Sequence, residues 1–501
     1  MTSPPTTSRL AATLVAVGLI AAVAAALGLG VPALDGEPGA AAAVDEPQYL
    51  LTALSLAEDG TLDIADELAA GREGTFHPAP LPVQTEVRPD GTQVSPHDPL
   101  LAVLLAPAVA VGGWVGAKLL LASLAGALAA LSIWVAVRRF GVPLAIAGIV
   151  VAAAATSAPL SVYGQQVYPE LPAALAVLVA VAALTGRLGR GGLVALVLAV
   201  VALPWLSVKY APLAAVLTLL GLVVLWRTGR AGAAAAVAAA LGAAGAAFLG
   251  LHQVLYGGWT AYAAGDHFQN SGELGVVGLS PDYAGRSTRL VGLLVDRDFG
   301  LVAWQPAWLL LVPAVAALPR LLPRGATPGW TVLVVPLLTG WLVATFVALT
   351  MHGYWWPGRQ VVVVLPLGVL AVTVWLAHLH RTIRPSHRAI VSAAALLAAA
   401  GTGLYAWVLV AGWSGRLSWV DAPDQPVPGA VAVLRSALPD YRVLDIQTWW
   451  LHAAWVLGCL GLAALGVRTA RPAPRAPTVV GHHLEPVPAA RTFQPTSATH
   501  R

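Results

Sequence analysis

The stretch LLLASLAGALAALSIWVAVRR (residues 119–139) has 19 consecutive uncharged residues, which are followed by Arg138 and Arg139. About 20 such residues are needed for a helix to cross the hydrocarbon core of a bilayer. Because lipid offers no hydrogen bonds to the backbone, a run of this kind has to be helical. The 501-residue chain is 58% hydrophobic and 10% charged, with a mean hydropathy of +0.75. Soluble domains carry about a quarter charged residues, so this composition excludes a mainly soluble protein.

Similar apolar runs recur along the sequence, and they predict an all-α polytopic membrane protein with about twelve transmembrane helices. We expect residues 1–468 to form the transmembrane domain, with long outer loops at 33–113, 256–298 and 412–446 that contain short interfacial helices. The Arg/Pro-rich segment 469–501 is predicted to be a disordered cytoplasmic tail. The predicted spans lie near residues 10–32, 114–137, 141–159, 169–186, 191–206, 208–226, 231–255, 299–318, 329–350, 360–379, 389–411 and 447–467.

Three details of this pattern need separate interpretation. The run from Leu10 to about Pro32 is longer than a signal-peptide core, so we interpret it as a retained first helix, with a secretory signal as the alternative. Leu100–Val111 is too short to span and is expected to be a re-entrant or interfacial helix. Cys459 is the only cysteine, which excludes a disulfide framework and a cysteine-based metal site.

Basic and acidic residues divide unequally between the two sides of this topology. With the N-terminus inside, 17 of the 28 Lys and Arg residues fall on the inner side, whereas Glu485 is the only one of the 24 acidic residues there. Enrichment of basic residues marks the cytoplasmic side, so both termini are predicted to be cytoplasmic. This topology also explains the basic pI without nucleic-acid binding. The acidic outer loops are candidates for acid–base chemistry.

The dipeptide Asp45–Glu46, followed by Pro47, comes soon after the first predicted span and opens a stretch with one apolar side. That stretch is expected to lie along the membrane surface. Two interpretations of the carboxylates remain open. In the first interpretation, one carboxylate caps the following helix, whose first turn contains the proline. In the second, one carboxylate takes a proton from a hydroxyl nucleophile.

Further candidate residues lie at the outer edges of the spans. Tyr168 and Glu170 occupy a short outer turn, where Glu170 is either a functional acid or a helix N-terminal acid favoured by the helix dipole. Lys209, Arg359 and Arg297 are outer cations, which contact either lipid headgroups or a bound phosphate.

Aromatic and histidine residues complete the set of candidates. Tryptophans are more numerous on the predicted outer side, and Trp355 and Trp356 are candidates for stacking on a sugar ring as well as for an interfacial belt. His97 is a candidate substrate contact. His77, His97 and Asp98 share the first loop, but no spacing motif supports a metal site there. No cofactor is clearly indicated, although a divalent metal is compatible with the sequence. There is no Walker motif, dinucleotide fingerprint or nucleophile elbow.

Several stretches together resemble the GT-C superfamily, the multispanning glycosyltransferases that use polyprenyl-phosphate-linked sugars. The similarity is to its bacterial members related to protein mannosyltransferases and aminoarabinose transferases, and it extends over about residues 45–366. The stretches are DEPQYLLTALSLAEDGTLDI (45–64), VRPDGTQVSPHDPLL (87–101), QQVYPELPAAL (165–175), PWLSVKYAP (204–212), DRDFGLVAWQPAW (296–308) and GYWWPGRQVVVVLP (353–366).

The resemblance implies that Asp45 is the general base and that Glu46 supports it. It also implies that Lys209 and Arg359, with Arg297 behind them, stabilise a departing lipid phosphate while the sugar is transferred with inversion. The implied partners are a polyprenyl-phosphate sugar, membrane lipid and an unidentified lipid, glycan or protein acceptor. Two other functions remain open, namely a carrier or flippase for a lipid-linked or small polar substrate, and a non-catalytic scaffold with the same fold.

Overall fold

The computed structural model describes residues 6–470 apart from 35, 36, 38, 83, 266–281, 323–328, 383, 422–424 and 426. The predicted tail from residue 471 onward therefore lies outside the described residues. Within the described part all regular elements are helices, and the only β-type pairings are two isolated bridges. The principal helices are α1 (Thr7–Ala26), α2 (Glu46–Glu58), α3 (Ala65–Ala69), α4 (Leu100–Phe140), α5 (Leu144–Ala155), α6 (Leu160–Tyr163), α7 (Glu170–Leu184), α8 (Arg190–Leu206), α9 (Ala211–Arg227), α10 (Ala231–Tyr256), α12 (Tyr283–Arg286), α13 (Arg289–Val295), α14 (Leu301–Trp304), α15 (Leu311–Leu321), α16 (Thr331–Leu342), α17 (Leu365–Thr382), α18 (Pro385–Trp413), α19 (Gly429–Ser436) and α20 (Ile446–Thr469).

Seven helical segments of the described residues are long and apolar enough to cross a membrane. They are Thr7–Gly30, Leu100–Phe140, Val208–Arg227, Ala231–Ala264, Arg359–Thr382, Pro385–Trp413 and Ile446–Thr469. The other five predicted spans coincide with shorter apolar helical segments of 10–17 residues. The all-helical class is therefore confirmed, whereas the count of about twelve spans is not, because five of the helices fall short of 18 residues.

Helix α4 shows how small residues set the arrangement of the first spans. Its backbone leaves helical geometry at Gly112 and Gly113, and the latter has φ +56°, so residues 100–111 form a separate segment as predicted. Further along, α4 crosses α1 where Gly126 meets Gly18, since a Cβ on Gly126 would lie 2.6 Å from the Gly18 carbonyl oxygen. Such close approach is typical of packed membrane helices. It packs α1 closely against α4.

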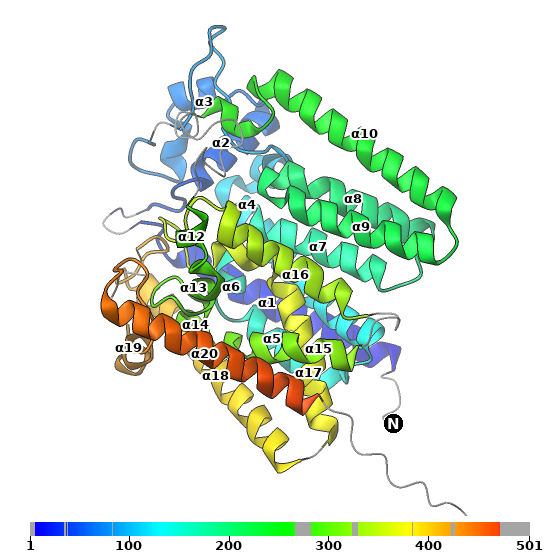
Figure 1. The fold of residues 1–501 in the computed structure, drawn as a ribbon. Helices are drawn as coiled ribbons and strands as arrows, with labels where there is room; N and C mark the ends of the chain where they lie inside the picture. The colour runs from blue at the N-terminus through cyan, green and yellow to red at the C-terminus, as the bar shows by residue number, and fades with distance from the viewer. Residues whose placement is uncertain are drawn as a thin grey trace, which may run out of the picture. The chain divides into compact units, whose positions relative to one another are not determined.

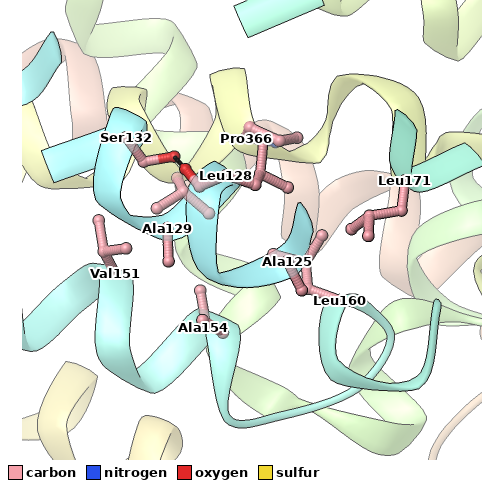
Figure 2. A pocket seen from close by; sticks show the side chains of 11 residues that line it. Ala125, Leu128, Ala129, Ser132, Val151, Ala154, Leu160, Leu171 and Pro366 are labelled. Carbon is pink, nitrogen blue, oxygen red and sulfur yellow. Dashed lines mark hydrogen bonds between the residues drawn. The ribbon is translucent and has the colours of Figure 1, made fainter. Parts of the chain in front are cut away.

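The centre of the bundle is α17, whose residues from Leu365 to Ala377 are all buried. It packs against α4, α5, α15, α16 and α18, while α8, α9 and α10 lie side by side in Figure 1. Between α4, α5 and α17 a void of about 20 Å³ is lined almost entirely by apolar side chains (Figure 2). Ser132 is satisfied there because its hydroxyl donates to the Leu128 carbonyl at 2.7 Å. The apolar surroundings offer this hydroxyl no other partner, so the bond within its own helix satisfies it.

Helix α2 differs from the sequence expectation. Instead of presenting one apolar face to a membrane surface, it is buried along most of its length and packs against α4. Leu50 and Leu51 are 2% and 0% exposed, and the polar Gln48 and Thr52 on the other sides are also buried. The interfacial prediction was wrong because periodicity shows only that one side is apolar, whereas here protein surrounds the helix. This burial holds the start of α2 in a fixed position.

Candidate active site

A cavity of about 180 Å³ lies where α2, the segment before α4, the break between α8 and α9, and the end of α16 meet. Its volume is below the usual range of a small-molecule pocket, so a large ligand would enter only in part or with movement of the walls. Asp45, Tyr49, His97, Asp98, Pro169, Ser207, Lys209, Tyr210, Leu213, Tyr262, Gly340, Val343, Ala348, Leu349, Thr350, Trp355, Arg359, Gln360 and Val363 line it. Five of the predicted site residues are therefore neighbours although they come from distant parts of the sequence, namely Asp45, His97, Lys209, Trp355 and Arg359.

A chain of ion pairs forms the charged wall of this cavity. Arg359 donates from Nη2 to Asp45 Oδ2 at 2.9 Å and from Nε to Glu170 Oε1 at 3.0 Å. Lys209 Nζ donates to the same Glu170 oxygen at 2.8 Å. Two cations and two carboxylates thus alternate, and their charges balance. Glu170 Oε2 is buried and has no hydrogen-bond partner among the described residues.

Asp45 does not act as a helix cap in this structure. It occupies the N-cap position of α2, but its side chain accepts no capping hydrogen bond from the helix backbone. The carboxylate instead faces the cavity with 21% of the side chain exposed. Burial alone would raise the pKa of Asp45, but the charges of Arg359 and His97 outweigh it, so the pKa lies below its usual value. Asp45 is therefore an ionised, partly accessible acceptor.

Glu46 points away from the cavity into the protein interior. Its Oε1 accepts from Lys118 Nζ at 3.1 Å and from the Val167 amide at 2.7 Å, and its Oε2 accepts from the Ala43 amide at 3.2 Å. Lys118 Nζ also donates to Gln165 Oε1 at 3.2 Å. Glu46 and Lys118 are 2% and 1% exposed. This pair fixes the start of α2 against α4 and thereby positions Asp45.

The sequence interpretation did not include Lys118, although a signal was present. It is the single charged residue inside the apolar run of the second predicted span. An ionisable group within a membrane segment is costly and usually has a partner and a purpose. That argument was applied to Glu170 and applies equally to Lys118. Its partner, Glu46, lies 72 residues away in the chain, so the sequence could not identify the pair.

The aromatic residues around Arg359 hold its guanidinium in place. The guanidinium carbon lies 3.9 Å from the ring centroid of Tyr168 and 5.1 Å from that of Trp355, both within cation–π range. Gly358 precedes it with φ +84°, a backbone conformation that glycine adopts without strain, and a Cβ there would lie 2.8 Å from Leu301. The backbone turn at Gly358 thus directs Arg359 toward Asp45 and Glu170.

His97, Asp98 and the helix break that carries Lys209 also line the cavity. His97 stacks on Tyr49 with 4.7 Å between the ring centroids, and burial lowers its pKa. Asp98 Oδ2 accepts from the Val208 amide at 2.8 Å, while Oδ1 lies 2.9 Å from His252 Nε2. The break at Ser207 is thereby held, and Lys209 is held at the cavity. The sequence interpretation named Asp98 only as a possible metal ligand and missed this positioning role.

Two predicted substrate contacts lie away from the cavity. Trp356 is fully buried between Trp304 and Trp419, with ring centroids at 4.5 and 5.3 Å. Arg297 pairs with Asp440 at 3.6 Å and donates to the carbonyls of Arg435 and Leu438. Both residues therefore stabilise packing within the protein. Their sequence signals, an outer tryptophan and an outer arginine, do not distinguish a packing role from ligand binding.

The predicted histidine set does not converge on a metal position. His77 Nδ1 lies 2.7 Å from the Ala79 carbonyl oxygen, whereas His97 and Asp98 line the cavity. In the described part of the chain, one group of three metal-ligand side chains does converge, formed by Asp59, Asp66 and Glu67. The cavity itself therefore offers carboxylates and cations for acid–base and phosphate chemistry.

No family model matches this sequence, and no curated protein matches it significantly.

Proposed function

We propose that this chain is a polytopic membrane glycosyltransferase that moves a sugar from a polyprenyl-phosphate donor to an acceptor hydroxyl. The observation that carries the proposal is the convergence of Asp45, Arg359 and Lys209 on one cavity. Acceptor activation requires a carboxylate, and departure of a lipid phosphate requires cations. The resemblance of residues 45–366 to the GT-C superfamily supports the same chemistry.

The reaction follows from the positions of these groups. The acceptor oxygen attacks the anomeric carbon as its proton passes to Asp45. The bond from that carbon to the phosphate oxygen breaks, and the phosphate leaves with the electron pair. Arg359 and Lys209 stabilise the added negative charge. A single displacement inverts the anomeric configuration, and no further nucleophile is required.

The ion pairs at the cavity give the donor phosphate a second role. In this structure Asp45 is bound to Arg359, which makes its carboxylate a weaker base. A phosphate that takes over hydrogen bonds of Arg359 releases Asp45 beside the acceptor. Donor binding thus raises the basicity of the carboxylate at the moment when a base is required. This order of events also disfavours proton transfer in the absence of donor.

The proposed topology has about twelve spans, cytoplasmic termini and an extracytoplasmic cavity. In a Cys459→Ala background, a cysteine introduced at Thr75 should react with an impermeant maleimide in intact cells. A cysteine at Ser386 should react only after permeabilisation. Thr75 and Ser386 are both exposed, so the two positions differ in the side of the membrane rather than in burial. Equal labelling in intact cells would contradict this topology.

The activity itself is tested with purified protein and a panel of radiolabelled polyprenyl-phosphate sugars. Transfer or hydrolysis removes label from the lipid fraction in an Asp45-dependent manner. A carrier or flippase instead moves the labelled lipid across a vesicle membrane without breaking its phosphate bond. Movement of intact lipid without loss of label, for every donor in the panel, would replace the enzymatic proposal with the transport function.

A further inference from the structure

Three carboxylates converge in the first long loop, outside the cavity. Asp59 is the residue that ends α2, while Asp66 and Glu67 lie in the first turn of α3. Their ligand oxygens all lie within 4.8 Å of one another. Three negative charges at this spacing repel one another, so the arrangement favours a compensating positive charge or a proton.

The burial of Glu67 and its lack of hydrogen-bond partners are a second, independent indication of a ligand. Glu67 is 2% exposed, and neither of its carboxylate oxygens has a hydrogen-bond partner among the described residues. Arg72, a cation that interacts with Glu67 through space, is already bound by Glu58 through two hydrogen bonds of 2.9 and 2.7 Å. A buried carboxylate without a donor is rare and unfavourable.

The geometry points to a calcium ion bound by Asp59, Asp66 and Glu67. Calcium binds oxygen at about 2.3–2.6 Å, so two ligands on opposite sides of the ion lie up to about 5 Å apart. The three ligand oxygens lie within 4.8 Å of one another, which is compatible with this range. Magnesium is usually bound by one or two carboxylates and retains several waters, so a set of three carboxylates suits calcium better. A set of oxygen donors alone also disfavours zinc.

The three residues leave room for the rest of a calcium coordination sphere. Asp59 and Asp66 are exposed, so water can complete the six to eight ligands that calcium takes. The ion would join the end of α2 to the start of α3. Because α2 begins beside the cavity at Glu46, calcium would stabilise the loop that holds Asp45. This inference goes beyond the proposed transfer reaction and does not depend on it.

The test uses the full-length protein, stripped with EDTA in a neutral detergent. Equilibrium dialysis with radioactive calcium should show one ion bound per chain, and calcium should raise the melting temperature by several degrees. Magnesium at the same concentration should have a clearly smaller effect. The double variant Asp66→Asn/Glu67→Gln should lose both calcium binding and the calcium-dependent rise in melting temperature.

Two further variants make the result specific. Glu86→Gln removes an exposed carboxylate of the same loop that is not among the three, and it should bind calcium normally. The exposed Asp59→Asn should weaken binding at least tenfold and serves in place of the double variant if that protein does not fold. The proposal is overturned if the wild-type protein binds no calcium, since Glu67 is then neutralised by a proton. Binding that survives in both Asp59→Asn and the double variant, or an equal response to magnesium, also overturns it.

Discussion

Replacing Lys118 with methionine tests whether the buried ion pair holds the start of α2. Methionine keeps an unbranched chain of similar length but has no ammonium group. The substitution therefore removes the hydrogen bonds to Glu46 at 3.1 Å and to Gln165 at 3.2 Å while largely preserving packing. It leaves the Glu46 carboxylate buried and without its counter-charge.

The expected loss follows from the groups that remain. Removing one partner of a buried ion pair destabilises a protein by about 3–5 kcal/mol. Glu46 retains the amides of Val167 at 2.7 Å and Ala43 at 3.2 Å, which continue to stabilise its charge. We therefore expect a loss near the lower limit, about 3 kcal/mol. The double variant Lys118→Met/Glu46→Gln removes both charges and should be more stable than Lys118→Met alone.

The assay is reversible unfolding in detergent, with sugar transfer measured on the same samples. Leu119→Met is the matched control, because Leu119 is the next residue of α4 and is 46% exposed. That control should change stability and activity very little. A Lys118→Met protein as stable as the wild type, or a double variant as unstable as the sum of the two single changes, would refute the positioning role.

The other predictions concern the cavity directly. Asp45→Asn removes the proton acceptor and should reduce transfer about a hundredfold or more, while the protein remains folded. Wild-type transfer by this variant would exclude Asp45 as the base. Arg359→Lys keeps the charge but loses the planar guanidinium that binds both Asp45 and Glu170, so donor affinity should fall about tenfold or more. Unchanged lipid-phosphate binding in Arg359→Ala and Lys209→Ala would place the phosphate elsewhere. The lowered pKa of Asp45 keeps it ionised above its usual titration range. The acidic limb of kcat/KM should therefore lie below about pH 4, and Asp45→Glu should move it; a limb near pH 6 in the wild type would indicate another group.

Much of the architecture could be predicted from local sequence. Each of the twelve predicted spans corresponds to a helical segment of the described residues, and the break at Gly112–Gly113 separates 100–111 from the second span. Apolar runs predict helices because a lipid-embedded backbone has to satisfy its own hydrogen bonds. Helix length is less well determined, since irregular turns and prolines such as Pro306 divide a run without changing its hydropathy.

The candidate site, too, could be predicted only in part from the sequence. The sequence showed that Lys209 and Arg359 are charged residues at the edges of apolar runs, where a charge is unfavourable without a partner, and that Asp45 follows the first span in an outer loop. It did not show that Glu170 joins the two cations or that Asp45 meets Arg359 across 314 residues.

The tertiary structure also separated residues that looked alike in the sequence. The neighbours Asp45 and Glu46 have different surroundings, since one faces the cavity and the other is buried against Lys118. Likewise, Trp355 lines the cavity, whereas its neighbour Trp356 is fully buried. The hydropathy of a segment depends only on its own residues, so it can be determined from the sequence. The partner of a charge is determined by which helices pack together, and that depends on contacts between residues distant in the chain.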